Sequence, residues 1–315
     1  LRYKQYVPKN PTFLKRILHL LDFTFGTFIN IFKVKKTDVI ICVVPFIGTV
    51  FLGKVLSKIR RAKLWVHIQD FEFDAVTDSN IIGTKSNKNF IFKLLFWFEK
   101  KLLNSADFLS TISKSMILKL NDKTSKGKKN KLLPNWVDSN FIKPQNFTKH
   151  KYLCSSKFKI LYSGNIGEKQ DWGFFIEFVK ALKSEKEIEI IVVGNGSKRI
   201  WLEEKLLDLD NVYFYSPVKY SELSDLLCSV DLHVLFQKID VIDTVMPSKI
   251  LAMMSSERPS LITGNLKSEV SSIINNSRAG KYFGTEKIDE VIQFVQHLKS
   301  NKTLQNEYGK NARKF

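Results

Sequence analysis

Cysteine is rare in this chain, and no apolar run is long enough to cross a membrane. Cys42, Cys154 and Cys228 form no C-x-x-C pair and are too few for a disulfide framework. Isolated in apolar surroundings, they indicate a reducing, cytosolic compartment and predict core packing. The best apolar run, residues 39–52, is shorter than the ~18 to 20 residues of a membrane span and contains a proline and a glycine. We interpret it as a buried strand followed by a turn.

Motifs of several enzyme classes are also missing. No Gly-x-x-x-x-Gly-Lys-Ser/Thr sequence is present, which argues against an NTPase, and no Gly-x-Ser-x-Gly elbow supports a serine hydrolase. The histidines have no metal-ligand spacing to cysteines or to one another, so we predict no zinc site. Neither a signal peptide nor an initiator Met stands at the start, and we expect the chain to begin partway through a longer protein.

Acidic residues are scarce in the first half. Residues 1–155 carry 28 Lys and Arg against 10 Asp and Glu, a net charge of +18, whereas residues 156–315 carry 22 against 21. A basic half beside a neutral half indicates an anionic partner, either nucleic acid or the cytoplasmic leaflet of a membrane. The alternative is a solvated lysine-rich surface without a partner.

Strand-like runs alternate with helix-length segments in both halves. These runs cover residues 39–44, 64–68 and 108–112, and then 158–162, 188–193, 212–215, 232–236 and 259–263. The alternation predicts parallel βαβ units, and 44% apolar residues suffice for two cores. We therefore predict two doubly wound α/β domains at 1–145 and 156–315, with a surface loop at 121–131 and an interdomain connection at 143–156.

Two helical segments, at 11–32 and 88–103, combine bulky apolar residues with lysines and arginines. Such helices can lie in a membrane interface, with the apolar side down and the basic side near the headgroups. The alternative for the second segment is an apolar stripe that covers the sheet. The stripe would consist of Ile91, Leu94, Leu95, Phe98 and Leu102, which leaves Phe92, Phe96 and Trp97 as membrane-facing candidates.

Two glycine turns follow strands in the second half. Leu161-Tyr-Ser-Gly-Asn-Ile-Gly167 runs into a helix predicted at 173–183, and Val193-Gly-Asn-Gly-Ser197 precedes Lys198 and Arg199. A glycine turn at a helix N-terminus presents unpaired backbone N–H groups and a positive dipole end, which suit a diphosphate. Both turns should lie at the carboxyl edge of one sheet, where ligands bind in this architecture. Neither matches the dinucleotide fingerprint, and ordinary βα turns are the alternative.

Polar residues at the ends of elements complete the candidate site. Lys249 follows Pro247 and Ser248 at a helix start, where a lysine opposes the helix dipole unless it binds an anion. The alternative is a lysine that projects into solvent. In the first half, His67 and Asp70 end a strand and are expected to face a cleft. A structural role is the alternative for the histidine.

Together these motifs resemble the GT-B glycosyltransferases of family four, in particular the bacterial O-antigen, capsule and colanic acid branch that includes fucosamine transferases. The markers are His67-Ile-Gln-Asp-Phe-Glu-Phe-Asp74, Ala106-Asp107 with Ser110-Thr-Ile-Ser113, Leu133-Pro-Asn-Trp-Val-Asp138, Tyr162-Ser-Gly-Asn-Ile-Gly167, Val193-Gly-Asn-Gly196 and Pro247-Ser-Lys249. The resemblance implies a GT-B fold of two Rossmann-like domains that face a cleft. It also implies that the first strands of the N-terminal domain and part of the last helix are missing.

The resemblance implies a retaining glycosyltransferase of bacterial surface polysaccharide synthesis, such as lipopolysaccharide O-antigen or capsule. It would move a sugar, possibly an N-acetylated deoxy-amino sugar, from a UDP-sugar to a lipid-linked glycan, without a metal or other cofactor. His67 and Asp70 would face the reacting sugar as catalytic residues. The donor-binding candidates are Gly164, Asn165, Ile166, Gly167, Lys169, Gly194, Asn195, Gly196, Arg199, Val218, Ser248 and Lys249. The enzyme would be cytoplasmic and peripheral on the inner face of the cytoplasmic membrane, held by its basic N-terminal half.

Some residues depart from the family pattern. Asn165 stands where many members carry an arginine, and Thr244 and Ala252 stand where many carry two glutamates. The second of those glutamates usually grips the ribose in the family. Their absence places more weight on Ser248 and Lys249 as donor contacts.

Two other functions stay open at this point. One is a sugar-nucleotide epimerase of similar two-domain shape, which would not need a basic membrane face. The other is a basic nucleic-acid-binding protein, which the charge of the first half would permit. Because the basic residues are scattered over βα units and no recognised nucleic-acid motif is present, we expect no nucleic-acid partner.

Overall fold

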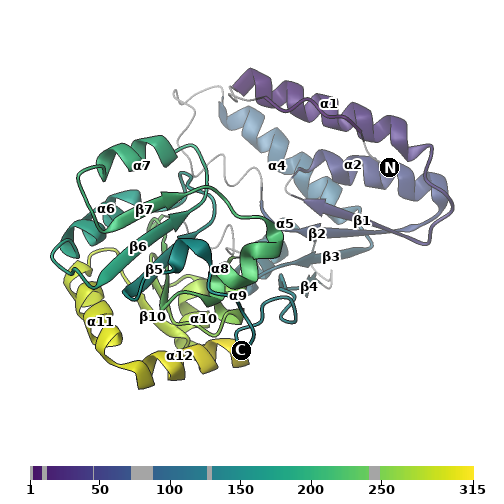
Figure 1. The fold of residues 1–315 in the computed structure, drawn as a ribbon. Helices are drawn as coiled ribbons and strands as arrows, with labels where there is room; N and C mark the ends of the chain where they lie inside the picture. Colours follow the sequence, from purple (N-terminus) through teal and green to yellow (C-terminus); the bar gives the residue numbers. More distant parts are fainter. Residues whose placement is uncertain (1–2, 9–12, 45, 72–87, 126–129, 241–248) are drawn as a thin grey trace. The chain divides into compact units, whose positions relative to one another are not determined.

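The computed structural model describes residues 3–8, 13–44, 46–71, 88–125, 130–240 and 249–315 (Figure 1). The chain divides into two compact units, Leu1–Pro134 and Asn135–Phe315, and each is described by itself. Both contain parallel strands joined by helices, which is the α/β class that the sequence predicts.

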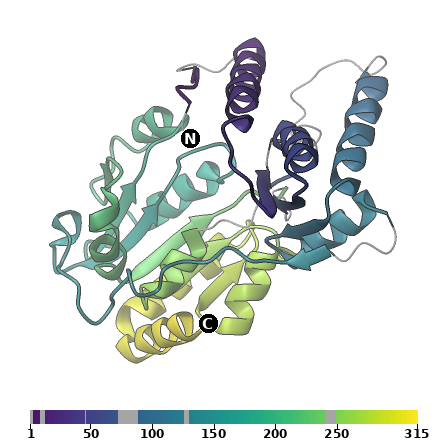
Figure 2. The same cartoon turned by 90° about the vertical axis from the view of Figure 1, so that its right-hand side faces the viewer.

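The first unit contains a sheet of four parallel strands in the order β1-β2-β3-β4. Its elements are α1 (Phe13–Ile31), β1 (Val39–Val44), α2 (Gly48–Arg60), β2 (Lys63–Ile68), α4 (Lys88–Asn104), β3 (Phe108–Thr111), α5 (Lys114–Lys123) and β4 (Asn130–Leu132). Helix α2 packs against β1 and β2 and also contacts α1 and α4, between which it lies in Figure 2.

Apolar side chains of β2 form the centre of the first core. Leu64, Val66 and Ile68 occupy alternate positions, so they share one face of the sheet, and all three are buried. Helix α2 can approach this face closely because Gly53 has no side chain: a Cβ there would lie 2.2 Å from Cys42 Sγ. Cys42 is thus a packing residue, as predicted.

The core stripe predicted for α4 is wrong in part. Leu94 and Phe98 are exposed, whereas Leu102 is buried and Leu95 is half-buried. The side chain of Ile91 lies outside the described residues. The buried side of α4 is therefore rotated away from the predicted stripe.

The membrane-facing candidates on α4 also divide. Trp97 is exposed, as expected. Phe96 instead lies beneath the ammonium group of Lys123, whose Nζ is 4.7 Å from the ring centroid. The side chain of Phe92 is outside the described part of the chain. Only Trp97 of this set is therefore placed toward solvent.

The loop predicted at 121–131 contains regular structure at both ends. Helix α5, capped by the Ser113 hydroxyl, continues to Lys123. Asn130–Leu132 then pairs with β3 as the parallel edge strand β4. Polar residues can form an edge strand because one side of such a strand stays in water, so β4 carries little apolar signal.

The second unit contains a sheet of six parallel strands in the order β10-β9-β8-β5-β6-β7. Its strands are β5 (Phe158–Ser163), β6 (Ile188–Val193), β7 (Val212–Tyr215), β8 (Leu232–Phe236), β9 (Ser260–Thr263) and β10 (Gly280–Phe283). The order reverses between β5 and β8, which is the doubly wound arrangement of a Rossmann fold. Ligands of such sheets bind outside the carboxyl ends of the strands at this switch point.

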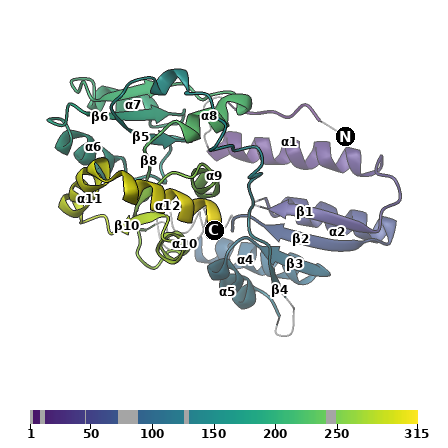
Figure 3. The same cartoon turned by 60° about the horizontal axis from the view of Figure 1, so that its bottom comes forward.

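Helices cover both faces of the second sheet (Figure 3). They are α6 (Trp172–Ala181), α7 (Arg199–Lys205), α8 (Leu223–Cys228), α9 (Lys249–Ser255), α10 (Glu269–Ser277), α11 (Ile288–Ser300) and α12 (Lys302–Lys314). Right-handed crossovers that leave the sheet centre in opposite directions place α6 and α9 on opposite faces. Accordingly, α6 packs with α11, and α9 packs with α12.

Residues 143–156, expected to connect the domains, pack on the second unit instead. Leu153 and Ile142 are buried in a core cluster with residues of β5, β6 and α8. The backbone N–H of His150 donates to Ser229 Oγ at 2.9 Å. Just before this segment, Arg313 of α12 donates to the backbone carbonyls of Ser139 and Ile142. These contacts explain why the boundary falls after Pro134. Cys154, in this segment, is exposed, so the core role predicted for it is wrong.

Candidate functional site

The two glycine turns lie side by side at the carboxyl edge of the second sheet. Strands β5 and β6 end in register at Ser163 and Val193, so the turns follow from neighbouring positions. Gly164 donates its N–H to the Val193 carbonyl at 2.9 Å, and Ile166 donates to the Asn195 carbonyl at 2.9 Å. The turns are therefore hydrogen-bonded to each other.

Close backbone contact explains the glycines of the second turn. A Cβ on Gly194 would lie 1.9 Å from the Gly164 carbonyl oxygen, and one on Gly196 would lie 2.3 Å from the Ile166 carbonyl oxygen. Gly196 also has a φ of +157°, which side chains disfavour. These glycines are required by turn-to-turn packing.

Backbone N–H groups of the two turns, which we predicted to be unpaired, have partners within the protein. The N–H groups of Gly164 and Ile166 bond across the turns, and Gly196 N–H donates to the Asn195 side chain at 2.8 Å. The start of α6 is also occupied, because the Asp171 carboxylate accepts from the N–H of Phe174 at 3.0 Å. A capping carboxylate at this helix start opposes a second anion.

Lys249 approaches the first turn from the start of α9. Its Nζ donates to the Tyr162 hydroxyl at 2.9 Å and lies 4.3 Å from the centroid of the tyrosine ring. The same atom would be 2.9 Å from a Cβ on Gly164, so the ammonium group sits directly over the turn. Lys249 does not project into open solvent, which decides against that alternative.

Burial lowers the pKa of Lys249 to about 8. Among the described carboxylates, none forms an ion pair with it. A partly buried cation without a carboxylate loses hydration and gains little in return, which favours the arrival of an anionic ligand. Lys249 is therefore the strongest anion-binding candidate in this unit.

Tyr162 holds the lysine and the turn together. Its hydroxyl accepts from Lys249 and donates to the Asn165 carbonyl at 2.7 Å. Burial raises the pKa of Tyr162, so the hydroxyl stays protonated and keeps donating. Tyr162 was not among the predicted site residues; its position, second to last in the strand that leads into the turn, was the available signal.

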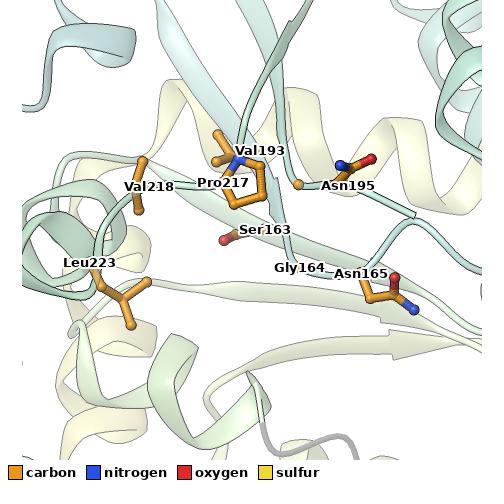
Figure 4. Close-up of a pocket in the computed structure, with 9 residues that line it drawn as sticks. Ser163, Gly164, Asn165, Val193, Asn195, Pro217, Val218 and Leu223 are labelled. Atoms are coloured by element: carbon orange, nitrogen blue, oxygen red, sulfur yellow. The ribbon is translucent and has the colours of Figure 1, made fainter. Parts of the chain in front are cut away.

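A cavity of about 360 Å³ opens beside the turns (Figure 4). Its lining comes from the ends of β5 and β6, from the segment after β7 and from the start of α8: Ser163, Gly164, Asn165, Val193, Gly194, Asn195, Pro217, Val218 and Leu223. In Figure 4 the side chains of Val218 and Leu223 lie on one side, and those of Asn165 and Asn195 on the other. A planar polar ring could contact apolar surface on the first side and amides on the second.

Arg199, a predicted diphosphate contact, is used within the protein. Its guanidinium donates to the carbonyls of Gly194 and Tyr215, the latter at 2.9 Å. Its Nε also donates to Glu203 at 2.9 Å, on the next turn of α7. Through Nε and Nη1, Arg199 therefore holds the second turn against β7, and its contact with a donor stays a prediction.

The remaining donor candidates are less defined. Lys169 is exposed on the first turn, and its carbonyl accepts from Lys238. Ser248, like Thr244, lies outside the described residues. Ala252 packs beside the hydrophobic cluster of the second unit, so an apolar residue suits this position.

His67 and Asp70, the catalytic candidates, lie at the end of β2 in the first unit. His67 is buried, and burial lowers its pKa, which keeps the ring neutral near pH 7. Its Nδ1 is 2.9 Å from Ser110 Oγ, and its Nε2 is 2.8 Å from Gln69 Nε2. Trp65 Nε1 donates to the same serine at 2.7 Å. The ring is thus fixed on both sides, while Asp70 is half-buried just past the strand.

Comparison with known proteins identifies the family. Residues 157–301 match the family model described as glycosyl transferases group 1. The chain is 33% identical over 277 residues to WcaI of Escherichia coli (strain K12), named for a colanic acid biosynthesis glycosyl transferase, with 84% of this chain and 67% of that protein covered.

Solved structures share the fold at low identity. TarM of S. aureus, in a complex with fondaparinux, alpha-GlcNAc-glycerol and UDP, matches with a TM-score of 0.64 and 15% identity, over 94% of this chain and 55% of its own. Anabaena HepE, in a complex with UDP-glucose, matches with a TM-score of 0.67 and 13% identity, over 96% and 78%. The chain thus spans about half the length of TarM and two thirds of WcaI. By its fold, which is of the GT-B type, and by its identity to WcaI, the chain belongs to the glycosyl transferases of group 1.

Proposed function

We propose that the chain serves in a retaining transferase of bacterial surface polysaccharide synthesis, which moves a sugar from a UDP-sugar to a lipid-linked glycan. The observation that carries the proposal is the ammonium group of Lys249, held over the glycine turn without a carboxylate partner among the described residues. Membership in the glycosyl transferases favours transfer over an epimerase or a nucleic-acid-binding protein.

The donor diphosphate would meet Lys249 at the switch point of the second sheet. When the sugar leaves, negative charge builds up on the nucleotide, and a fixed ammonium group stabilises that charge. The anion also favours the charged lysine, whose pKa should rise from about 8 on binding. Tyr162 would set the height of the ammonium group above the turn.

The base would occupy the cavity beside the turns. Pro217, Val218 and Leu223 offer apolar contacts, and the side chains of Asn165 and Asn195 offer amides to a pyrimidine edge. A cavity of about 360 Å³ suits a small base with part of its ribose. That TarM and HepE were solved with UDP or UDP-glucose supports uridine as the base.

Other parts of the proposal rest on resemblance and charge. We propose a lipid-linked acceptor, an N-acetylated deoxy-amino sugar as a candidate donor sugar, transfer without a metal ion, and work at the inner face of the cytoplasmic membrane. The colanic acid name of WcaI supports a polysaccharide product. The basic first half supports an anionic membrane partner. In this scheme His67 and Asp70 would face the reacting sugar.

Calorimetric titration with UDP, GDP and ADP tests the donor site. We expect UDP to bind in preference to the other two, and Lys249→Ala to weaken UDP at least about tenfold, because it removes a charge-assisted hydrogen bond. Lys205→Ala, an exposed lysine on α7, is the matched control and should bind like the wild type. If none of the nucleotides binds folded protein, or if both variants bind UDP equally well, the donor-site proposal fails.

A further inference from the structure

The outward side of α1 is apolar. The α1 stripe consists of Leu18, Leu21, Phe25, Phe28, Ile29 and Phe32, which are 42% to 63% exposed. Apart from the adjacent pair Phe28 and Ile29, they follow one another at spacings of three and four residues. This spacing places them along one face of the helix and its C-terminal end. A surface helix normally turns polar residues to water along such a face, so the stripe is unusual.

The other sides of α1 already have partners within the first unit. Phe23 packs edge-on against Phe46 with ring centroids 5.9 Å apart, and Ile31 is buried. The N-terminal segment lies along a further side, where Tyr3 covers Gly26 and donates to Asp22 at 2.8 Å. The α1 stripe is therefore a separate face and not the packing face of the helix. Figures 1 and 3 show α1 as a single straight helix along this unit.

Positive charge surrounds the α1 stripe. Residues 1–36 contain eight Lys and Arg and one acidic residue, Asp22. The Asp22 carboxylate accepts hydrogen bonds from the Tyr3 hydroxyl and the Tyr6 N–H, within the protein. Lys15 near one end, and Lys33, Lys35 and Lys36 past the other, are exposed. Cations beside an exposed apolar row match anionic headgroups above acyl chains.

We propose that the α1 stripe inserts into the surface of an anionic lipid bilayer, with α1 lying parallel to the membrane plane. Among the described helices, none is long and apolar enough to cross a bilayer. The inference rests on the proposed function in one respect: a lipid-linked acceptor would be met at that surface. It assigns the contact to α1 and not to α4, whose described side chains include fewer exposed apolar residues and whose Phe96 is covered by Lys123.

Flotation with lipid vesicles tests the assignment. The full chain is mixed with vesicles of phosphatidylcholine, alone or with phosphatidylglycerol, at low and high salt. We expect flotation with the anionic vesicles and less at high salt. The triple variant Leu21→Gln/Phe25→Gln/Phe28→Gln should partition at least about tenfold less. Exposed positions were chosen so that the variant folds, which its thermal transition checks.

A matched triple variant separates the α1 stripe from general hydrophobicity. Leu118→Gln/Ile200→Gln/Leu207→Gln changes three apolar residues that are at least as exposed but lie elsewhere, and it should float like the wild type. Equal flotation of the two triple variants would overturn the inference, as would a wild-type chain that floats with neither vesicle. A wild-type dimer in ultracentrifugation that the stripe variant dissociates would also overturn it, because a second copy would then cover the stripe. UDP titration of the stripe variant should match the wild type, which keeps this result separate from the donor-site test.

Discussion

Replacing Lys249 by methionine should stabilise the second unit while removing its affinity for UDP. Burial lowers the pKa of Lys249 from 10.5 to about 8, so a charged lysine costs the folded state about 3 kcal/mol, at about 1.4 kcal/mol per pH unit. Methionine has a similar length and no charge. It also loses the hydrogen bond to Tyr162, which subtracts about 1 kcal/mol. We expect a net gain of about 2 kcal/mol in the free energy of unfolding at pH 7.

The gain should depend on pH in a defined direction. The folded pKa lies below the unfolded one, so the unfolded chain binds more protons between about pH 8 and 10.5. Wild-type stability from this group therefore rises with pH across that window, because the folded lysine loses its charge first. The methionine variant has no such rise. Its advantage should be full below about pH 8 and fall below about 1 kcal/mol at about pH 9.5.

Urea unfolding, followed by tryptophan fluorescence at about pH 7 and about pH 9.5, measures this difference in the free energy of unfolding. The exposed-lysine variant Lys205→Met is the control and should match the wild type at both. Comparison at one pH removes the contribution of all other titrating groups, since both proteins share them. A methionine variant that is less stable than the wild type at neutral pH would refute the predicted cost of the buried charge. A gain in stability that is the same at both pH values would refute it as well. Tight UDP binding by that variant would refute the proposed contact between Lys249 and the donor.

Two further variants test the turns. Gly194→Ala places a Cβ 1.9 Å from the Gly164 carbonyl oxygen, so we expect a loss of about 2 to 3 kcal/mol in chemical unfolding. Gly173→Ala, whose Cβ would meet nothing nearer than 3.4 Å, should show no comparable loss. Arg199→Ala frees the carbonyls of Gly194 and Tyr215 and should cost about 2 kcal/mol, with at most about a threefold change in UDP affinity by calorimetry. A loss of UDP affinity as large as that of Lys249→Ala would instead indicate that Arg199 contacts the donor phosphates.

Strands with a nearly continuous apolar run could be predicted from the sequence because their signal is local. Residues 39–44, 188–193 and 232–236 are apolar except for Glu189 and His233, and they form β1, β6 and β8 with those bounds. Strands buried on both faces, such as β6 and β8, need no alternation, so a short apolar run suffices to mark them. The burial predicted for β1 is wrong in part, because Val39, Ile41 and Val43 are 47% to 56% exposed. By contrast, β4 (Asn130–Leu132) and β10 (Gly280–Phe283) were missed. Both are short edge strands whose existence depends on a neighbour supplied by the rest of the sheet.

The domain boundary could not be read from local composition for a related reason. Residues 143–156 are polar and lysine-rich, which is typical of a linker. The segment is held by the buried side chain of Leu153 and, just before it, by that of Ile142. Two of its backbone N–H groups also donate to Asp225 of α8 and to Ser229, the C-cap of that helix. A segment with few apolar residues can dock firmly when a distant helix end supplies the partners.

In the candidate site, too, local sequence did not distinguish two cations whose contacts differ in the fold. Arg199 and Lys249 both stand at a helix start near a glycine turn, so the sequence assigned the same phosphate role to both. The planar guanidinium of Arg199 can bridge two carbonyls at once, and the fold places those of Gly194 and Tyr215 within its reach. The compact ammonium group of Lys249 lies over the Gly164 turn and, among the described residues, donates to the Tyr162 hydroxyl above the tyrosine ring. The different contacts of the two cations thus come from which backbone carbonyls the sheet brings near each of them, and this is why we propose Lys249 as the diphosphate contact.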